Sequence, residues 1–271
     1  MQCPTPHAED EMRPSFGWLC LLLLSMVALP HLASAQTTSR TVMGVFAHPD
    51  DERIVGPLLA HYAREGRQVL LVISTDGSKG VTDHAGIPAG PGLAAVRAKE
   101  AQCAAERLGV QPPILLGLED GGLASFDNLG RLRQELTRLV EAHRPEVLLT
   151  IGPEGGTGHP DHRLVGNVIT EVVQGLTWAN PPALFYASLP AERMRSAPLA
   201  PPRVTPLPER YLPVQVPFTP ADLAAGQASF NCHASQYTDA QRAAINRMLA
   251  YGFNGKVHLR PWFGTGEGVT P

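Results

Sequence analysis

The tripeptide His-Pro-Asp occurs twice in this chain, at residues 48–50 and 159–161. The first copy continues into Asp51 and Glu52, and the second is followed by His162. Imidazole and carboxylate groups together make a ligand set that suits zinc. Proline and acidic residues also suit an ordinary helix start, but a helix start does not require the two histidines of the second copy. The pair of clusters therefore predicts a metal site.

Hydrolysis is the chemistry that such a site would support. Three protein ligands plus a water are the usual arrangement of a catalytic zinc site, and zinc lowers the pKa of that water to ~7. The two clusters hold more than three candidate ligands. A spare carboxylate could accept the water proton, and an imidazolium could stabilise an oxyanion. The predicted reaction is hydrolysis of an amide or an ester.

Both tripeptides follow apolar runs that are typical of buried strands, at residues 41–46 and 146–151. Strand-like runs alternate with helical patterns along the chain. The strands are expected at residues 42–47, 69–74, 113–116, 146–151 and 183–187, and the helices up to residue 64 and at residues 93–108, 129–143, 160–174 and 220 to about 251. This alternation predicts an α/β, Rossmann-like three-layer fold with a mainly parallel sheet. Ligands bind at the carboxyl edge of such a sheet, so the two tripeptides are expected to meet there.

The composition is that of an ordinary globular protein. Hydrophobic residues make up 44% of the chain and charged residues 17%, with a formal net charge of −3. Nucleic-acid-binding proteins are usually basic, so a nucleic-acid partner is not expected.

The first 35 residues have the pattern of a signal peptide. Arg13 precedes an apolar run at residues 16–29, and Ala33-Ser34-Ala35 offers a cleavage site. Cleavage would leave a single domain, residues 36–271, without a stable membrane span. We therefore expect an extracytoplasmic location (periplasmic, cell-envelope or secreted), with an uncleaved N-terminal anchor as the alternative. The start codon, Met1 or Met12, stays open.

Only two cysteines, Cys103 and Cys232, follow the predicted cleavage site. Export would permit a disulfide between them. Cys103 lies in an apolar helical pattern, where a buried, inert thiol is common. We expect the two residues to be unpaired.

The chain resembles the PIG-L, or LmbE-like, N-acetylglucosaminyl deacetylase family. The resemblance covers residues 41 to about 249. It rests on Ala-His-Pro-Asp-Asp-Glu at residues 47–52, Arg-Ala-Lys-Glu at residues 97–100, Gly-Gly-Thr-Gly-His-Pro-Asp-His at residues 155–162 and His-Ala-Ser-Gln at residues 233–236. One departure is Thr157, where some relatives carry a tyrosine. This departure leaves the exact substrate open.

The resemblance implies a role for each residue of the two clusters. The implied zinc ligands are His48, Asp51 and His162, with Fe²⁺ as another possible metal. The implied catalytic groups are Asp50 as general base, His159 as oxyanion stabiliser or general acid, and Asp161 as the carboxylate that orients the His159 ring. The implied substrate-binding residues are Arg97 and Asp120. His233 could also approach the site, but a structural role in a turn with Ser235 is preferred.

The resemblance implies an exported zinc-dependent hydrolase that removes the N-acetyl group from an N-acetylglucosamine-containing glycan, glycolipid or glycoconjugate. One alternative is a deacylase of another small amide, such as an acylated antibiotic or a thiol conjugate. Another is a carbohydrate-binding protein without catalysis, against which the intact Asp50 argues. A nucleotide-binding domain is disfavoured, because carboxylates rather than a Gly-rich turn follow the first strand. The oligomeric state stays open.

Overall fold

The structure is a computed structural model that describes residues 40–197 and 204–262. The predicted signal peptide, residues 1–35, lies outside the described residues and stays a prediction.

A seven-stranded sheet with the order β3-β2-β1-β4-β5-β7-β6 forms the middle layer. Five neighbouring strands are parallel, as the β-α alternation predicts: β1 (Thr41–Phe46), β2 (Gln68–Thr75), β3 (Ile114–Leu118), β4 (Val147–Ile151) and β5 (Ala183–Ser188). β7 (Lys256–Pro261) pairs antiparallel with β5, and β6 (Val214–Pro217) pairs antiparallel with β7. The predicted α/β fold with a mainly parallel sheet is confirmed.

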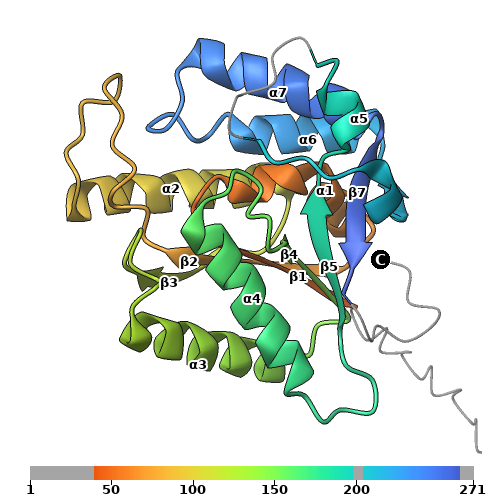
Figure 1. The fold of residues 1–271 in the computed structure, drawn as a ribbon. Coiled ribbons are helices and arrows are strands. Elements are labelled where there is room, and N and C mark those ends of the chain that lie inside the picture. Colours follow the sequence, from red (N-terminus) through yellow and green to blue (C-terminus); the bar gives the residue numbers. More distant parts are fainter. Residues whose placement is uncertain (1–39, 198–203, 263–271) are drawn as a thin grey trace, which may run out of the picture. The chain divides into compact units, whose positions relative to one another are not determined.

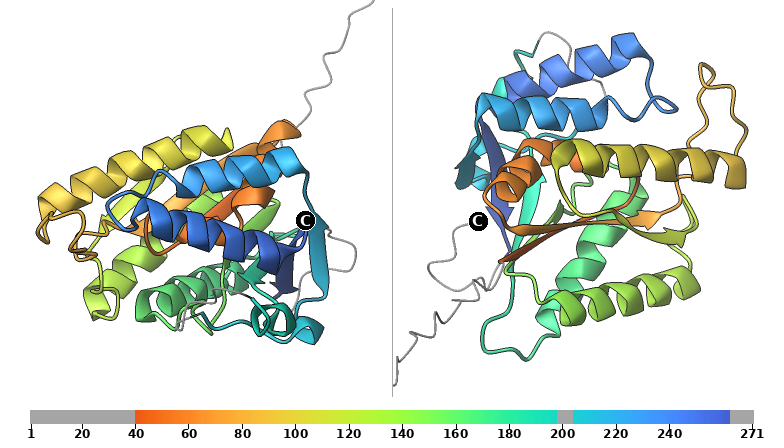
Figure 2. Two further views of the ribbon diagram at one scale, coloured as in Figure 1. Left: turned by 90° about the horizontal axis from the view of Figure 1, so that it is seen from above. Right: turned by 180° about the vertical axis from the view of Figure 1, so that it is seen from behind.

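Helices cover both faces of this sheet (Figures 1 and 2). One face carries α1 (Gly56–Arg64), α2 (Pro91–Leu108), α6 (Pro220–Phe230) and α7 (Asp239–Phe253), and the other carries α3 (Phe126–His143) and α4 (Pro160–Gln174). The short elements are η1 (Asp51–Ile54), α5 (Ala191–Met194) and η2 (Glu209–Tyr211). Side chains alternate along β1, so that Val42 belongs to one hydrophobic cluster and Met43 to the other. The sheet therefore separates two hydrophobic cores, and the loops beyond the ends of its strands can carry polar groups.

The helical pattern predicted from residue 220 to about 251 is two helices rather than one. α6 and α7 are separated by residues 231–238. Thr238 starts α7 with a capping box, in which its hydroxyl accepts from the Gln241 N–H and the Gln241 side chain accepts from the Thr238 N–H. Such a box satisfies free N–H groups at a new helix start. The break leaves a non-helical segment between the two helices.

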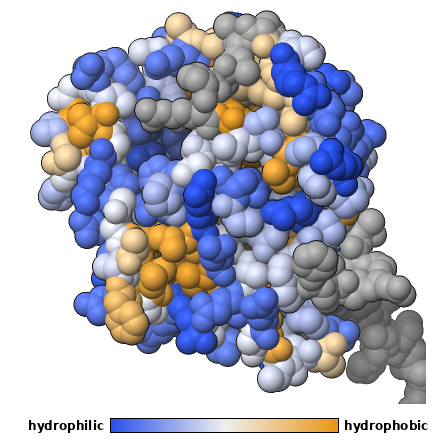
Figure 3. Space-filling view, viewed as in Figure 1, coloured by the Kyte–Doolittle hydropathy of each residue, from blue (hydrophilic) through white to orange (hydrophobic). Residues whose placement is uncertain are grey.

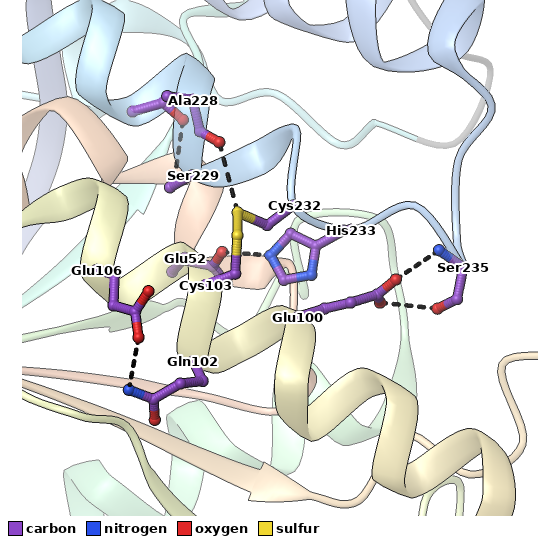
Figure 4. Close-up of a disulfide and its surroundings, with 11 residues drawn as sticks. Glu52, Glu100, Gln102, Cys103, Glu106, Ala228, Ser229, Cys232, His233 and Ser235 are labelled. Atoms are coloured by element: carbon purple, nitrogen blue, oxygen red, sulfur yellow. Dashed lines mark hydrogen bonds and ion pairs between the residues drawn. A yellow bond between two sulfur atoms is a disulfide. The ribbon is translucent and has the colours of Figure 1, made fainter.

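Cys103 and Cys232 form a disulfide, so the prediction of unpaired cysteines is wrong (Figure 4). Their Cα atoms lie 5.9 Å apart although 129 positions separate them in the sequence. The packing of α2 against α6 brings the two residues together, and a separation of this length hides such a contact from local patterns.

Polar side chains cover most of the face seen in Figure 3, and the largest group of apolar side chains on this face lies at its lower left. Phe126, the first residue of α3, is 92% exposed.

Within the described residues, no helix combines the length and the apolar character that a bilayer span requires.

Candidate active site

The two His-Pro-Asp clusters meet at the carboxyl edge of the sheet. The first cluster follows β1, and the second begins α4 after the Gly-rich loop that leaves β4. β1 and β4 are hydrogen-bonded neighbours, which is why clusters more than 100 residues apart converge. A cavity of about 610 Å³ opens beside them; its lining includes His48, Asp50, Asp51, Lys79, Arg97, Asp120, Thr157, His159, His162, Gln236 and Tyr237.

Three predicted ligands present their donor atoms to one point. His48 Nδ1 lies 3.1 Å from His162 Nε2 and 3.4 Å from Asp51 Oδ2, and His162 Nε2 lies 3.1 Å from Asp51 Oδ1. All three residues are buried. Two ring nitrogens and a carboxylate therefore form a compact triangle.

The ring of His162 is oriented by a hydrogen bond on its far side. Its Nδ1–H donates to the Gly155 carbonyl oxygen over 2.9 Å. In the neutral ring, Nε2 then carries a lone pair that faces His48 and Asp51. Close packing of α4 against the end of β4 sets the depth of this ring. A Cβ at Gly166 would lie 2.2 Å from the Ile151 carbonyl oxygen, so only glycine permits that approach.

His48 has carboxylates on the opposite side of its ring. Its Nε2 lies 3.1 Å from Asp120 Oδ1 and 3.3 Å from Asp161 Oδ2. Burial lowers the pKa of His48, but Asp120, Asp161 and Asp51 outweigh this effect and raise it well above its usual value. A neutral His48 ring that keeps its proton at Nε2, toward these carboxylates, would present the lone pair of Nδ1 to a metal ion.

Asp161 does not orient His159 through its carboxylate, and this corrects the implied role. Asp161 Oδ2 accepts from the Gly121 N–H over 2.7 Å and faces His48. The backbone N–H of Asp161, not its side chain, meets the His159 ring at Nδ1, at 3.2 Å. His159 caps the N-terminus of α4 through this bond. The cap leaves Nε2 as the N–H donor of a neutral ring.

The neutral form of His159 is favoured in this structure. Burial lowers the pKa of His159, and the nearby His48 and His162 lower it further. This differs from the imidazolium expected from the sequence. The ring is nevertheless half-buried at the cavity wall, where a neutral Nε2–H can donate a hydrogen bond.

Asp50 lies beside the triangle and makes none of its contacts. Tyr237 Oη donates to Asp50 Oδ2 over 2.9 Å, and Arg53 Nη1 lies 3.0 Å from Asp50 Oδ1. Burial raises the pKa of Asp50, but Arg53 and Arg97 outweigh it and lower the pKa below its usual value. The carboxylate is therefore ionised near neutral pH.

The two residues implied to bind substrate both line the cavity, and both have partners within the protein. Arg97 donates from Nη2 to the Pro49 carbonyl oxygen over 2.5 Å and from Nη1 to the Gly77 carbonyl oxygen over 3.2 Å. Asp120 accepts from the Lys79 N–H over 2.9 Å. Their contact with a substrate stays a prediction.

Two groups near the site were not assigned to it by the sequence. Tyr237 reaches Asp50 from the segment between α6 and α7. His233 is fully buried, with Nε2 2.7 Å from Glu52 Oε1. The break between α6 and α7 is the signal that could have located both, because it interrupts a helical pattern next to His233 and Tyr237.

The donors present fit zinc. Zn–N bonds of about 2.0–2.1 Å in a tetrahedral site place neighbouring donor atoms about 3.3 Å apart. The two ring nitrogens here are 3.1 Å apart, and each lies 3.1–3.4 Å from one of the two Asp51 carboxylate oxygens. The second contacts of His48 and His162 are of the kind that metal-bound histidines make. Among the described residues, the groups of three possible ligand atoms within 4.8 Å of one another are His48–His159–His162 and His48–Asp120–Asp161; both contain His48, and neither contains Asp51.

Comparisons with known proteins agree with this site. Residues 43–173 match the model of the PIG-L family, described as GlcNAc-PI de-N-acetylase. A 1D-myo-inositol 2-acetamido-2-deoxy-alpha-D-glucopyranoside deacetylase from Corynebacterium urealyticum is 31% identical over 254 residues, which cover 76% of this chain and 74% of that protein. The chain belongs to the PIG-L family. PIG-L proteins are metal-dependent deacetylases, so the prediction of this enzyme class is confirmed.

Two further proteins are similar to this PIG-L chain. A protein of the same name from Mycobacteroides abscessus is 35% identical over 161 residues; the match spans 52% of this chain but only 58% of that relative. The solved N,N'-diacetylchitobiose deacetylase from Pyrococcus horikoshii superposes with a TM-score of 0.65 at 22% identity, covering 86% of this chain and 87% of that one. At this identity the superposition shows a shared fold only.

The comparisons contradict the predicted location of this PIG-L chain. Export was inferred from the first 35 residues and was linked to substrates in the cell envelope or outside the cell. The relatives are named for deacetylating a small inositol glycoside instead. The prediction of a periplasmic, cell-envelope or secreted location is therefore wrong.

Proposed function

We propose that this chain is a zinc-dependent N-deacetylase of a compound that contains N-acetylglucosamine. The observation that carries the proposal is the donor triangle of His48, Asp51 and His162, whose edges of 3.1–3.4 Å match tetrahedral zinc. The names of the relatives supply the substrate class, because they specify an inositol glycoside of N-acetylglucosamine.

The triangle residues would hold the zinc ion, and Fe²⁺ is accepted by similar ligands. When bound, the ion would act as a Lewis acid that polarises the amide carbonyl and lowers the pKa of a water molecule. Asp50, ionised and 2.9 Å from Tyr237 Oη, accepts a proton from the attacking water. His159 donates a hydrogen bond from Nε2–H to the oxyanion. The proton taken by Asp50 is then available to the leaving amine.

A second, smaller cavity supports a short acyl group. It has a volume of about 60 Å³. Asp51 and His162 form part of its lining, and most of the rest is apolar side chains. These apolar residues include Ile54, Ile151, Ala187, Leu189 and Met248. A methyl group gains from such a wall, whereas a long acyl chain does not fit this volume. Acetyl is therefore favoured over the long acyl groups of an acylated antibiotic.

The large cavity, whose lining includes all three triangle residues, has room for a sugar. Its volume of about 610 Å³ lies within the range of small-molecule sites. Arg97 and Asp120 lie in its wall with Lys79 and Gln236, and these polar groups suit hydroxyl groups of a sugar. We propose Arg97 and Asp120 as substrate contacts on this basis.

Acetate release tests the proposal. Purified protein, reconstituted with one equivalent of zinc, is incubated with the inositol glycoside named for the relatives, with N,N'-diacetylchitobiose and with an N-octanoyl analogue of the preferred substrate. We expect acetate from an N-acetylated sugar, little reaction with the octanoyl analogue, loss of activity with a chelator and recovery with zinc. Sugar binding without acetate release would identify a carbohydrate-binding protein instead. Activity that is indifferent to chelation would exclude the metal.

A further inference from the structure

The backbone of Asp50 has an unusual conformation. Its φ is 108° and its ψ is −14°, in a region that residues other than glycine rarely adopt. Arg144 and Asn254 are the other described non-glycine residues with positive φ, at 43° and 50°, and both end helices, where this conformation is ordinary. Such strain persists only where the surroundings hold it.

Glu52 holds the strained residue. Its Oε2 accepts from the Asp50 N–H over 2.9 Å, and its side chain is completely buried. Its other oxygen, Oε1, lies 2.7 Å from His233 Nε2. A buried carboxylate without a partner would be strongly destabilising, so His233 is what keeps Glu52 in place.

Among the described residues, Glu52 is the only hydrogen-bond partner of the His233 ring. The ring is fully buried, and its Nδ1 has no hydrogen-bond partner in the described part of the chain. The polar contact of this ring is therefore the one at Nε2. Glu52 and His233 both lie outside the lining of the two cavities, so neither is placed to touch a substrate.

The segment that carries His233 is anchored to α2 on both sides (Figure 4). On one side Cys232 is bonded to Cys103. On the other side Ser235 donates from its backbone N–H and its hydroxyl to the two oxygens of Glu100, over 2.6 and 2.7 Å. These anchors fix the imidazole between the helix and Glu52.

We propose that the buried Glu52–His233 pair is a positioning device for the general base: it holds the Asp50 N–H, and with it the left-handed conformation that directs the Asp50 carboxylate to the site. The inference rests on the proposed function, in which Asp50 takes the proton of water. Glu52 and His233 are thus positioning residues that act through Asp50.

Substitutions at His233 test this role. His233→Leu should lower kcat by about 10–10²-fold, as small misplacements of catalytic groups do, with KM within about twofold and zinc content unchanged. His233→Gln keeps an N–H donor near the Nε2 position and should restore kcat to within about threefold of wild type. The matched control is His258→Leu, because His258 is also buried and bonded through Nε2, at 3.1 Å from the Phe253 oxygen, but lies outside both cavity linings. This control should lose stability and keep kcat.

A double-mutant cycle separates positioning from general loss of structure. With Asp50→Asn already present, His233→Leu should change kcat by less than about twofold, because the base it positions is gone. If His233→Leu lowers kcat by the same factor in wild-type protein and in Asp50→Asn, the inference is overturned. It is also overturned if His258→Leu lowers kcat as much as His233→Leu does. If the wild type releases no acetate, the proposed function fails and the conformation of Asp50 decides the inference. In a crystal structure of His233→Leu, a relaxed φ at Asp50 would support the inference and an unchanged φ would overturn it.

Discussion

Asp50 and Asp51 are neighbours in the sequence, yet their carboxylates serve different partners. Asp51 contacts His48 and His162, whereas Asp50 contacts Tyr237 and Arg53; Arg53 lies farther from Asp51, at 3.9 Å. The left-handed backbone at Asp50 turns the two side chains apart. In the proposed function, the metal ligand Asp51 and the general base Asp50 can therefore be adjacent without competing for one position.

Asp50→Asn is the sharpest test of the assigned base. The amide is nearly isosteric and can still accept from Tyr237, but it cannot take a proton. We expect kcat to fall by ~10²–10⁴-fold, which is the usual contribution of general-base catalysis. Zinc content, measured by metal analysis of the purified variant, should equal that of wild type. Loss of zinc as complete as in His48→Ala would make Asp50 a ligand.

His159 and His162 lie three positions apart, and we expect their substitutions to differ. His162→Ala removes a corner of the donor triangle and should weaken zinc binding. His159→Ala should keep zinc and lower kcat by about 10²–10³-fold, because it removes one donor to the oxyanion. Zinc titration followed by kcat at saturating zinc distinguishes the two. Equal zinc loss in both variants would contradict this division of roles.

At the scale of elements, the ion pair of Arg64 with Asp222 joins α1 to α6, and His61 Nδ1 of α1 lies 3.4 Å from Asp222 Oδ2 as well. Arg64 donates from Nε and Nη2 to the two oxygens of Asp222, over 2.9 and 3.0 Å, and Asp222 also caps α6 with Thr219. The Arg64 guanidinium and Thr219 hold the pKa of Asp222 below its usual range, against the opposing effect of burial. The pair connects the helix after the first cluster to the helix before His233.

The lowered pKa of Asp222 predicts an acid-dependent stability. A carboxyl whose pKa is lower in the folded state stabilises the fold above its unfolded pKa of ~3.9, and this stability is lost as the pH falls below that value. Asp222→Asn should therefore cost about 1–2 kcal/mol at pH 7, because the charge-assisted hydrogen bonds from Arg64 and from the Thr219 N–H are weakened, and it should flatten the decline of unfolding free energy below about pH 4. Urea denaturation at several pH values measures both. Glu135→Gln, in an exposed pair with Arg138, is the control and should change little.

The fold could be predicted because its determinants are local. Apolar runs of strand length alternate with helical patterns, and each His-Pro-Asp cluster directly follows a strand, so parallel pairing alone brings the clusters together. The backbone of Asp50, the carboxylate of Asp161 and the disulfide could not be predicted in this way. Each depends on contacts between residues 40 or more positions apart, or on a single dihedral angle, and local patterns contain neither.

At the scale of the whole molecule, the disulfide joins distant parts of the chain, and its removal should be costly. A bond that closes a loop of this length, 129 positions, typically contributes ~2–5 kcal/mol. We expect Cys103→Ser/Cys232→Ser to lower the free energy of unfolding by this amount, measured by urea denaturation. Thiol titration of unfolded wild-type protein is the control. Free thiols at both positions, or unchanged stability in the double variant, would contradict the bond.

The same bond shortens the path along the covalent structure between the two halves of the Glu52–His233 pair. Along the peptide chain the pair spans 181 positions. Through the sulfur atoms the path is roughly 52, because Glu52 lies 51 positions before Cys103 and His233 directly follows Cys232. Loop-closure entropy grows with the logarithm of length, so this shortcut makes the encounter of the two residues in the unfolded chain about 1 kcal/mol less unfavourable. The bond therefore makes it easier for His233 to meet Glu52 as the chain folds, even when the polypeptide between them is unfolded.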